Sequence, residues 1–78
     1  MPNIITVNGY RFFFYSNDHL PIHIHIEKDG KTAKFNLEPI ELVKAKRFNA
    51  AELRKARILV EENTQLFKQK WNEYFDKT

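Results

Sequence analysis

Apolar and polar residues alternate strictly from Ile22 to Lys28, and this period of two predicts a β-strand with one buried face. Asp29-Gly30 follows as a two-residue turn into a second strand over residues 31–37. Counting outward from this turn gives every apolar residue an apolar partner: Ile22 with Leu37, Ile24 with Phe35, and Ile26 with Ala33. One face of this hairpin is therefore predicted to be core. The other face pairs His23 with Asn36, His25 with Lys34, and Glu27 with Thr32.

An earlier hairpin is predicted near the N-terminus, where Asn8-Gly9 separates two apolar segments at residues 4–7 and 10–15. Asn-Gly is a strong signal for a tight turn, because both turn residues need a positive φ. Both faces of the second segment are aromatic, so we expect this strand to lie inside the sheet. The implied register pairs Val7 with Tyr10, Ile5 with Phe12, and Ile4 with Phe13.

The second half of the chain predicts a helix. A short fifth strand at residues 40–44 is expected at a sheet edge, where the preceding Pro39 is tolerated. Asn49 and Glu52 then have the spacing of a helix N-cap and a glutamate at N3. The pattern predicts one long helix from about 50 to 76, with a bend considered near Asn63. Its mainly apolar stripe recurs at three- and four-residue spacing in Leu53, Ala56, Val60, Asn63, Phe67, Trp71 and Tyr74.

Together these elements predict an α+β fold. Two consecutive β-hairpins form a small, mainly antiparallel sheet of four to five strands, and the long C-terminal helix packs on its apolar face. The 78 residues are expected to form a single domain, 1–78, near the lower size limit for a core without staples. Such a chain could depend on self-association, and Ile58, which points away from the apolar stripe, is the candidate contact of a homodimer.

The composition narrows the class of protein. The chain has no cysteine, which excludes disulfides and thiolate metal sites and fits a reducing compartment. The sequence does not open with a basic segment followed by an apolar one, and its apolar runs are far too short to span a membrane. We therefore expect a cytoplasmic protein without a membrane partner.

The net charge of +3 is concentrated in one segment. Residues 44–57 carry six basic residues against one acidic residue, whereas the rest of the chain carries seven basic and nine acidic residues. An RNA or DNA backbone is a natural partner for such an excess, although a solvated loop and helix start would have the same composition. The candidate nucleic-acid-binding residues are Lys44, Lys46, Arg47, Arg54, Lys55 and Arg57.

The histidines mark the candidate functional site. His23 and His25 project from one face of the predicted strand, about 6.6 Å apart along it, and His19 lies on the preceding loop. The two imidazoles could bind a divalent metal, with His19 or Asp18 as third ligand and water as fourth. His-x-His alone is a weak motif, and the charge of Lys34 beside His25 opposes a cation there. No cofactor is therefore expected, and a metal stays an alternative.

General acid–base catalysis without a metal also fits this face. One neutral and one protonated imidazole can accept and donate a proton near neutral pH, and a lysine could stabilise charge on a phosphate. This chemistry suits a metal-independent ribonuclease. Equally, these histidines could be ordinary strand positions, the aspartate could cap its own loop, and the tyrosine could belong to the core. The candidate catalytic residues are Tyr15, Asp18, His19, His23, His25 and Lys34.

The chain resembles the domain-of-unknown-function family 4160. The segments that carry the resemblance are residues 1–4, the aromatic strand 11–16, the run 17–26, and the closing helix with Leu66 and Trp71. Many members carry a second proline where Ile22 stands here. The most specific part, Asp-His-x-Pro-x-His-x-His, falls on Asp18, His19, Pro21, His23 and His25.

This resemblance implies a small prokaryotic protein whose family has no established activity. Members are often encoded beside a second small family of unknown function, 2442, and such pairs look like toxin–antitoxin modules. The resemblance therefore implies a cognate small protein as partner and RNA as target. Our leading hypothesis is a toxin–antitoxin-type component whose histidine site acts on RNA. The alternatives are a non-catalytic module that binds a cognate small protein through the histidine loop, and a histidine-based metal-binding domain.

Overall fold

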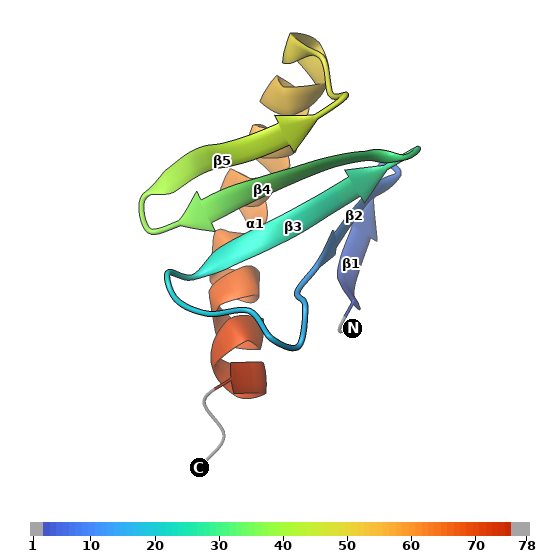
Figure 1. Ribbon diagram of the computed structural model, residues 1–78. Helices are drawn as coiled ribbons and strands as arrows, with labels where there is room; N and C mark the ends of the chain where they lie inside the picture. Colours follow the sequence, from blue (N-terminus) through green and yellow to red (C-terminus); the bar gives the residue numbers. More distant parts are fainter. Residues whose placement is uncertain (1–2, 76–78) are drawn as a thin grey trace.

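The sheet contains five strands in the order of the sequence, and one helix crosses it (Figure 1). The computed structural model describes residues 3–75. Each strand is antiparallel to its neighbours, as the two predicted hairpins require. The α+β fold and the fifth strand are therefore confirmed. The strands are β1 (Asn3–Val7), β2 (Tyr10–Phe13), β3 (His23–Lys28), β4 (Lys31–Leu37) and β5 (Ile40–Lys46).

Both two-residue turns have the predicted backbone. Asn8 and Gly9 have φ values of 52° and 83°, and Asp29 and Gly30 have values of 51° and 78°. Positive φ at both central residues twists the turn in the sense that matches the flanking strands. The turn chemistry therefore sets the register of each hairpin from its closed end.

The register of β3 and β4 is the predicted one from Glu27–Thr32 to His23–Asn36. Leu37 N also donates to the Ile22 carbonyl at 3.0 Å, which extends the pairing by one residue beyond the start of β3. The buried face of this hairpin carries the apolar residues and the other face carries the histidines, as the alternation indicated.

The predicted pairing of Ile4 with Phe13 is wrong. The pairs Val7–Tyr10 and Ile5–Phe12 form as expected, but Phe13 pairs with Asn3, so Ile4 is an extra residue at a register shift in β1. In a regular strand, Ile4 and Ile5 would point to opposite faces. The shift allows both isoleucines to pack against the same core, which gives the physical reason for it.

Helix α1 (Ala50–Phe75) is continuous through Asn63, whose side-chain amide donates to the Leu59 carbonyl at 2.8 Å. The end predicted at residue 76 lies outside the described residues. Among the described residues, no helix is long and apolar enough to cross a membrane. The helix packs its apolar stripe on the sheet over a core whose most deeply buried side chains are Phe12, Phe14, Ile24, Ile26, Phe35, Val60 and Phe67.

Strand β5 is longer than predicted and forms one edge of the sheet. Lys34 pairs with Lys44 and Phe35 pairs with Leu42, so Val43 is an extra residue at a bulge. Leu42 and Val43 are both exposed. At the other end of the fold, the connection between β2 and β3 passes beside the C-terminal half of α1 and returns over β3, which positions the site described next (Figure 1).

Candidate functional site

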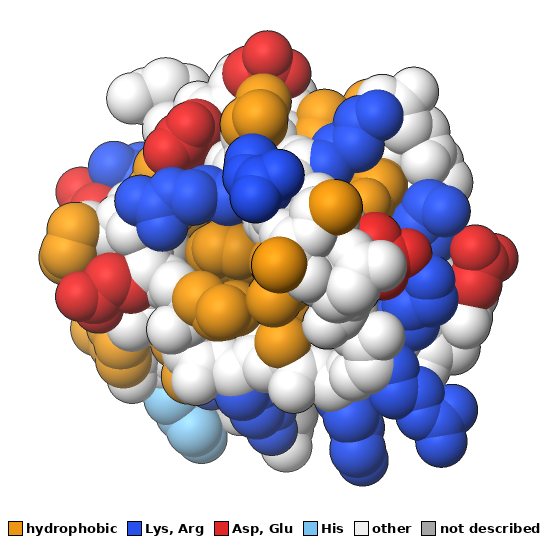
Figure 2. Space-filling model, turned by 90° about the horizontal axis from the view of Figure 1, so that it is seen from above, with side chains coloured by type: hydrophobic (Ala, Val, Ile, Leu, Met, Phe, Trp, Pro, Cys, Tyr) orange, Lys and Arg blue, Asp and Glu red, His pale blue; other side chains and the backbone are white. Residues whose placement is uncertain are grey.

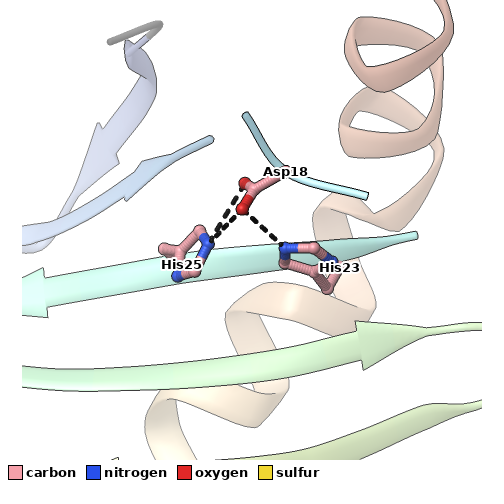
Figure 3. Close-up of side chains that lie close together, drawn as sticks. All are labelled: Asp18, His23 and His25. Atoms are coloured by element: carbon pink, nitrogen blue, oxygen red, sulfur yellow. Dashed lines mark hydrogen bonds and ion pairs between the residues drawn. The ribbon is translucent and has the colours of Figure 1, made fainter. Parts of the chain in front are cut away.

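Asp18 is held over β3 by a tight turn. Tyr15 N donates to Asp18 Oδ2 at 2.9 Å, and Asp18 N donates to the Tyr15 carbonyl at 3.1 Å. Aspartate favours such turns because its carboxylate accepts hydrogen bonds from nearby backbone amides. The two bonds fix the direction of the carboxylate, which points toward the histidines of β3 (Figure 3).

His23 and His25 converge on this carboxylate. Asp18 Oδ1 lies 3.2 Å from His23 Nε2 and 3.2 Å from His25 Nε2, and Oδ2 lies 3.1 Å from His25 Nε2 (Figure 3). The two histidines share a strand face because they are two residues apart. All three side chains are at most 15% exposed. We call Asp18, His23 and His25 the histidine cluster.

Aromatic rings enclose the two imidazoles. Trp71 contacts His23 at a ring-centroid distance of 5.1 Å, while Phe13 stacks on His25 at 5.5 Å and Tyr15 meets it edge-on at 4.6 Å. The sequence places Trp71 in the apolar stripe of the helix, and it is indeed buried. The sequence did not predict its contact with His23. That contact depends on where the helix crosses the sheet, and no sequence pattern indicates this position.

The hydrogen bonds define the tautomer of neutral His23. Its Nδ1 lies 2.8 Å from the carbonyl oxygen of Pro21. A carbonyl oxygen only accepts, so Nδ1 carries the proton and donates it. In a neutral ring, Nε2 is then left with a bare lone pair. This atom is buried and has no hydrogen-bond partner among the described residues, although it lies close to the Asp18 carboxylate.

The electrostatics favour an ionised aspartate beside a neutral histidine. Burial raises the pKa of Asp18, but the hydrogen bond from the Tyr15 amide and the interactions with His25 and His23 together outweigh it and leave this pKa below its ordinary value. Burial lowers the pKa of His25, the hydrogen bond and the charge of Asp18 raise it, and the nearby His23 and Lys34 lower it, so that this pKa lies below its ordinary value. At neutral pH, the cluster therefore contains a carboxylate and a neutral His25 imidazole.

A groove of about 350 Å³ opens beside His25. Its walls come from β3, β4 and β5, with Tyr15 and Phe13 at the β2 side. Lys34 lies opposite His25 in the register, as predicted, and Lys44 lies opposite Lys34 on the next strand. We call this the lysine groove, and its polar or charged lining residues are Tyr15, His25, Thr32, Lys34, Lys44 and Lys46.

The structure separates the remaining candidate residues. His19 is exposed and does not belong to the histidine cluster. Arg47 is exposed, with a φ of 74°, in the connection between β5 and α1. Arg57 is paired with Glu61 at 3.1 Å. Arg54 and Lys55 line a shallow hollow on α1 together with the exposed Ile58, the predicted dimer contact, which stays a prediction.

The basic segment 44–57 thus contributes to two surfaces. Lys44 and Lys46 belong to the lysine groove, whereas Arg54 and Lys55 lie on the helix. Seen from above, basic side chains lie in several separate places on the surface and not in one patch (Figure 2). The charge of the segment suggested one basic patch, whereas the structure divides its basic residues between two surfaces.

Comparison with known proteins identifies a family and nothing more specific. A family described as a domain of unknown function (DUF4160) matches residues 9–72 of the 78, a range that includes the whole histidine cluster and Trp71. Neither a curated protein nor a solved structure matches the chain significantly. The chain therefore belongs to the DUF4160 family, the family that its histidine motif indicated.

Proposed function

We propose that this chain is a toxin–antitoxin-type component that binds single-stranded RNA in the lysine groove and acts on it at the adjoining histidine cluster. The observation that carries this proposal is the groove itself, in which Lys34, Lys44 and Lys46 lie beside His25. The toxin–antitoxin assignment comes from the family resemblance, and the RNA assignment comes from the chemistry of the groove.

The charge of the groove favours a polyanion. Among the described residues, the groove lining contains no carboxylate, and Lys34, Lys44 and Lys46 form no ion pair. Lys31 and Lys68, in contrast, are each paired with a glutamate. Unpaired lysines on neighbouring strands suit a run of phosphates, because their charges are not neutralised internally.

An aromatic side chain at the end of the groove favours a single strand. Tyr15 is 45% exposed, so its ring is available to a base. Bases of single-stranded RNA are free to stack on such rings, and stacking contributes about 1–3 kcal/mol per base. Lysines for the backbone and a tyrosine for a base are the combination that single-strand-binding surfaces use.

His25 connects the groove to the histidine cluster. It lines the groove and also contacts the Asp18 carboxylate. His23 is 3% exposed, so direct contact with RNA falls to His25 and not to a pair of exposed imidazoles. Asp18 holds the ring of His25 in place, which is the usual role of a carboxylate behind a functional histidine.

The proposal is tested by fluorescence anisotropy with a short labelled single-stranded oligoribonucleotide. The double variant Lys44→Gln and Lys46→Gln should weaken binding by about tenfold or more and reduce the salt dependence of log K by about 0.7 for each phosphate that is no longer neutralised. The matched control, Arg54→Gln with Lys55→Gln, removes the same charge from the helix and should bind within about twofold of wild type. An equal decrease in affinity in both variants would refute a site in the groove.

Partner binding is a second candidate function, favoured by the exposed edge of the sheet. Leu42 and Val43 are exposed on β5, which has no neighbouring strand on its outer side within the described residues. An extended segment of a cognate small protein could add to this edge as a further strand. The purified product of the neighbouring gene should bind wild type in calorimetry, and Val43→Pro should abolish that binding. Unchanged binding by the variant would exclude the edge.

A further inference from the structure

The Nε2 atom of His23 is an exception to the rule that buried polar atoms are hydrogen-bonded. It is buried without a hydrogen-bond partner among the described residues, and it faces Asp18 Oδ1 at 3.2 Å. Because Nδ1 donates to the Pro21 carbonyl, neutral His23 presents a lone pair toward a carboxylate oxygen, which is also an acceptor. Two acceptors that face each other in a buried site repel, so the arrangement lacks a positive group between them.

A metal ion satisfies this geometry better than a proton. A proton on Nε2 would form a hydrogen bond to Asp18, but the two atoms do not have the alignment of one. A cation needs lone pairs that converge on a point, and one donor atom from each of Asp18, His23 and His25 lies within 4.8 Å of the other two. We therefore propose that Asp18 Oδ1, His23 Nε2 and His25 Nε2 bind one divalent transition-metal ion such as Zn²⁺.

Two of the three distances between the proposed donor atoms agree with this assignment. In a tetrahedral site with metal–ligand bonds of about 2.1 Å, neighbouring donor atoms are about 3.4 Å apart. Asp18 Oδ1 lies 3.2 Å from each of the two Nε2 atoms. Two imidazoles and one carboxylate suit zinc and neighbouring transition metals more than Mg²⁺ or Ca²⁺, which prefer oxygen ligands. Three protein ligands leave a fourth position for water.

The proposed ligand side chains are held in place by backbone groups and aromatic rings, as metal-binding side chains commonly are. The Pro21 carbonyl accepts from His23 Nδ1, and the Tyr15 amide donates to Asp18 Oδ2, so both ligands are held from their far sides. Trp71 packs against the His23 ring and Phe13 stacks on the His25 ring. Backbone partners of this kind set the tautomer and direction of ligands in metal proteins.

The Asp18 carboxylate offsets the repulsion that Lys34 exerts on a cation beside His25, which the sequence suggested. Lys34 lies beside His25 on β4, where it lines the lysine groove. The donor atoms of His23 and His25 converge on Asp18, which belongs to the connection between β2 and β3. The carboxylate supplies a negative charge at the point where the ion binds. Lys34 can therefore hold an anion while the ion occupies the cluster.

This inference does not rest on the RNA proposal. If both hold, an ion held by Asp18, His23 and His25 would supply metal-assisted chemistry beside the groove, in place of catalysis by the imidazoles alone. Loss of RNA binding in the lysine variants leaves the metal site intact, and absence of metal binding leaves the groove intact. The two experiments can therefore fail separately.

Trp71 supplies a direct measurement, because it is the single tryptophan of the chain and contacts a proposed ligand. Untagged, metal-free protein is titrated with ZnSO₄ and, in parallel, with CoCl₂, and Trp71 fluorescence is recorded. We expect one ion per chain, quenching by Co²⁺, and visible absorption of Co²⁺ in a tetrahedral site. Absence of saturable binding by either ion would overturn the proposal.

Variants identify the ligands. Asp18→Asn and His23→Gln keep the size of the side chain or nearly so, and each should weaken Zn²⁺ binding by about 100-fold or more, since loss of an outer partner alone costs about 10–100-fold. His19→Gln is the matched control, because His19 lies in the same loop but outside the cluster. It should bind Zn²⁺ within about twofold of wild type. A control as weak as the ligand variants would refute the assignment.

Nitrogen-15 NMR of the imidazoles tests the wild-type protein without any substitution. In the metal-free protein, His23 should be protonated at Nδ1 with a bare Nε2. On addition of Zn²⁺, the Nε2 signals of both His23 and His25 should shift, while the Nε2 proton of His25 is replaced by the ion and Nδ1 carries the ring proton. If His23 is protonated at both nitrogens and Zn²⁺ changes nothing, the cluster is an ion pair and the proposal is wrong.

Discussion

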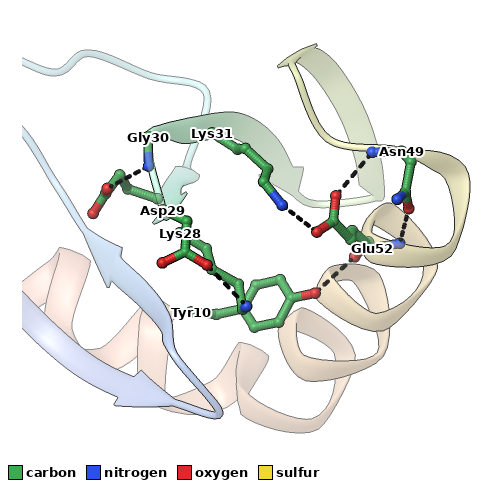
Figure 4. Close-up of polar contacts among 8 residues, drawn as sticks. Tyr10, Lys28, Asp29, Gly30, Lys31, Asn49 and Glu52 are labelled. Carbon is green, nitrogen blue, oxygen red and sulfur yellow. Dashed lines mark hydrogen bonds and ion pairs between the residues drawn. The ribbon is translucent and has the colours of Figure 1, made fainter.

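The two polar clusters near opposite ends of α1 differ in how completely their polar atoms are paired. Near the N-terminal end, Asn49, Glu52, Lys31 and Tyr10 form what we call the capping cluster (Figure 4). Glu52 N donates to Asn49 Oδ1 at 2.8 Å, and Asn49 N donates to Glu52 Oε1 at 3.0 Å. Lys31 Nζ donates to Glu52 Oε2, and the Tyr10 hydroxyl donates to the Glu52 carbonyl at 3.3 Å.

The histidine cluster, near the C-terminal half of the helix, leaves His23 Nε2 without a hydrogen bond from any described residue, beside a carboxylate. The capping cluster is partly open to solvent and could tolerate an unpaired atom, yet it has a partner for each carboxylate oxygen of Glu52. The buried cluster, where an unpaired atom costs most, is the one that lacks a partner. This difference is what we expect if the capping cluster stabilises the fold and the histidine cluster binds the proposed metal ion.

The largest expected effect on stability comes from removing packing in the core between the helix and the sheet, which carry both clusters. Phe67 is fully buried on α1 and packs on Phe12 at a ring-centroid distance of 5.1 Å. Phe67→Ala should lower the free energy of unfolding by about 3–5 kcal/mol, because the ring leaves a cavity in a small core. Urea denaturation followed by circular dichroism measures the loss. A loss below about 1 kcal/mol would show that the helix is not held through this contact.

A bound metal should stabilise the fold through the histidine cluster alone. At a free Zn²⁺ concentration of about 100 times Kd, the free energy of unfolding should rise by about 2.7 kcal/mol. Thermal denaturation with and without ZnSO₄ should show this rise in wild type and in Asn49→Ala, but not in Asp18→Asn. Equal stabilisation of Asp18→Asn would mean that zinc binds elsewhere.

Breaking the capping cluster should lower the free energy of unfolding by less than the loss of Phe67 does. Asn49→Ala removes the side-chain oxygen that accepts from Glu52 N, and loss of an N-cap typically costs about 1 kcal/mol. Chemical denaturation should show this loss, while Zn²⁺ affinity stays within about twofold of wild type. If Zn²⁺ affinity fell together with stability, the two clusters would be coupled and the comparison would fail.

The smallest expected effect is the pH dependence of the capping cluster. The hydrogen bond from Lys31 and the Asn49 amide lower the pKa of Glu52 from its ordinary value of 4.5. A carboxyl whose folded-state pKa is lowered stabilises the fold above its unfolded-state pKa, and this contribution is lost as pH falls through the folded-state pKa. Because the pair is exposed to solvent, the contribution is small.

Glu52→Gln tests this dependence. The difference in denaturation midpoint between wild type and the variant should be present at neutral pH and should shrink below pH 4.5. A constant difference down to about pH 2 would show that the ionised carboxylate contributes nothing and that only its geometry matters.

Local patterns predicted most of the fold. Alternation over residues 22–28 and the turns at Asn8-Gly9 and Asp29-Gly30 determine which face of each strand is buried. The spacing of Asn49 and Glu52 determines where the helix begins. The bulge at Ile4 was not predictable, because it arises from packing of both Ile4 and Ile5 on a core contributed by distant segments.

The sequence by itself determined that His23 and His25 share a strand face and that Lys34 lies beside His25, because the strand period and the turn at Asp29-Gly30 are local. Tertiary structure alone decided that Asp18 and not His19 joins them, and that Trp71 packs behind His23. It also decided that His23 Nε2 faces a carboxylate without a hydrogen-bond partner in the described part of the chain. The physical reason is that loop closure and helix placement are set by packing across the whole domain, and a periodic pattern carries no information about either.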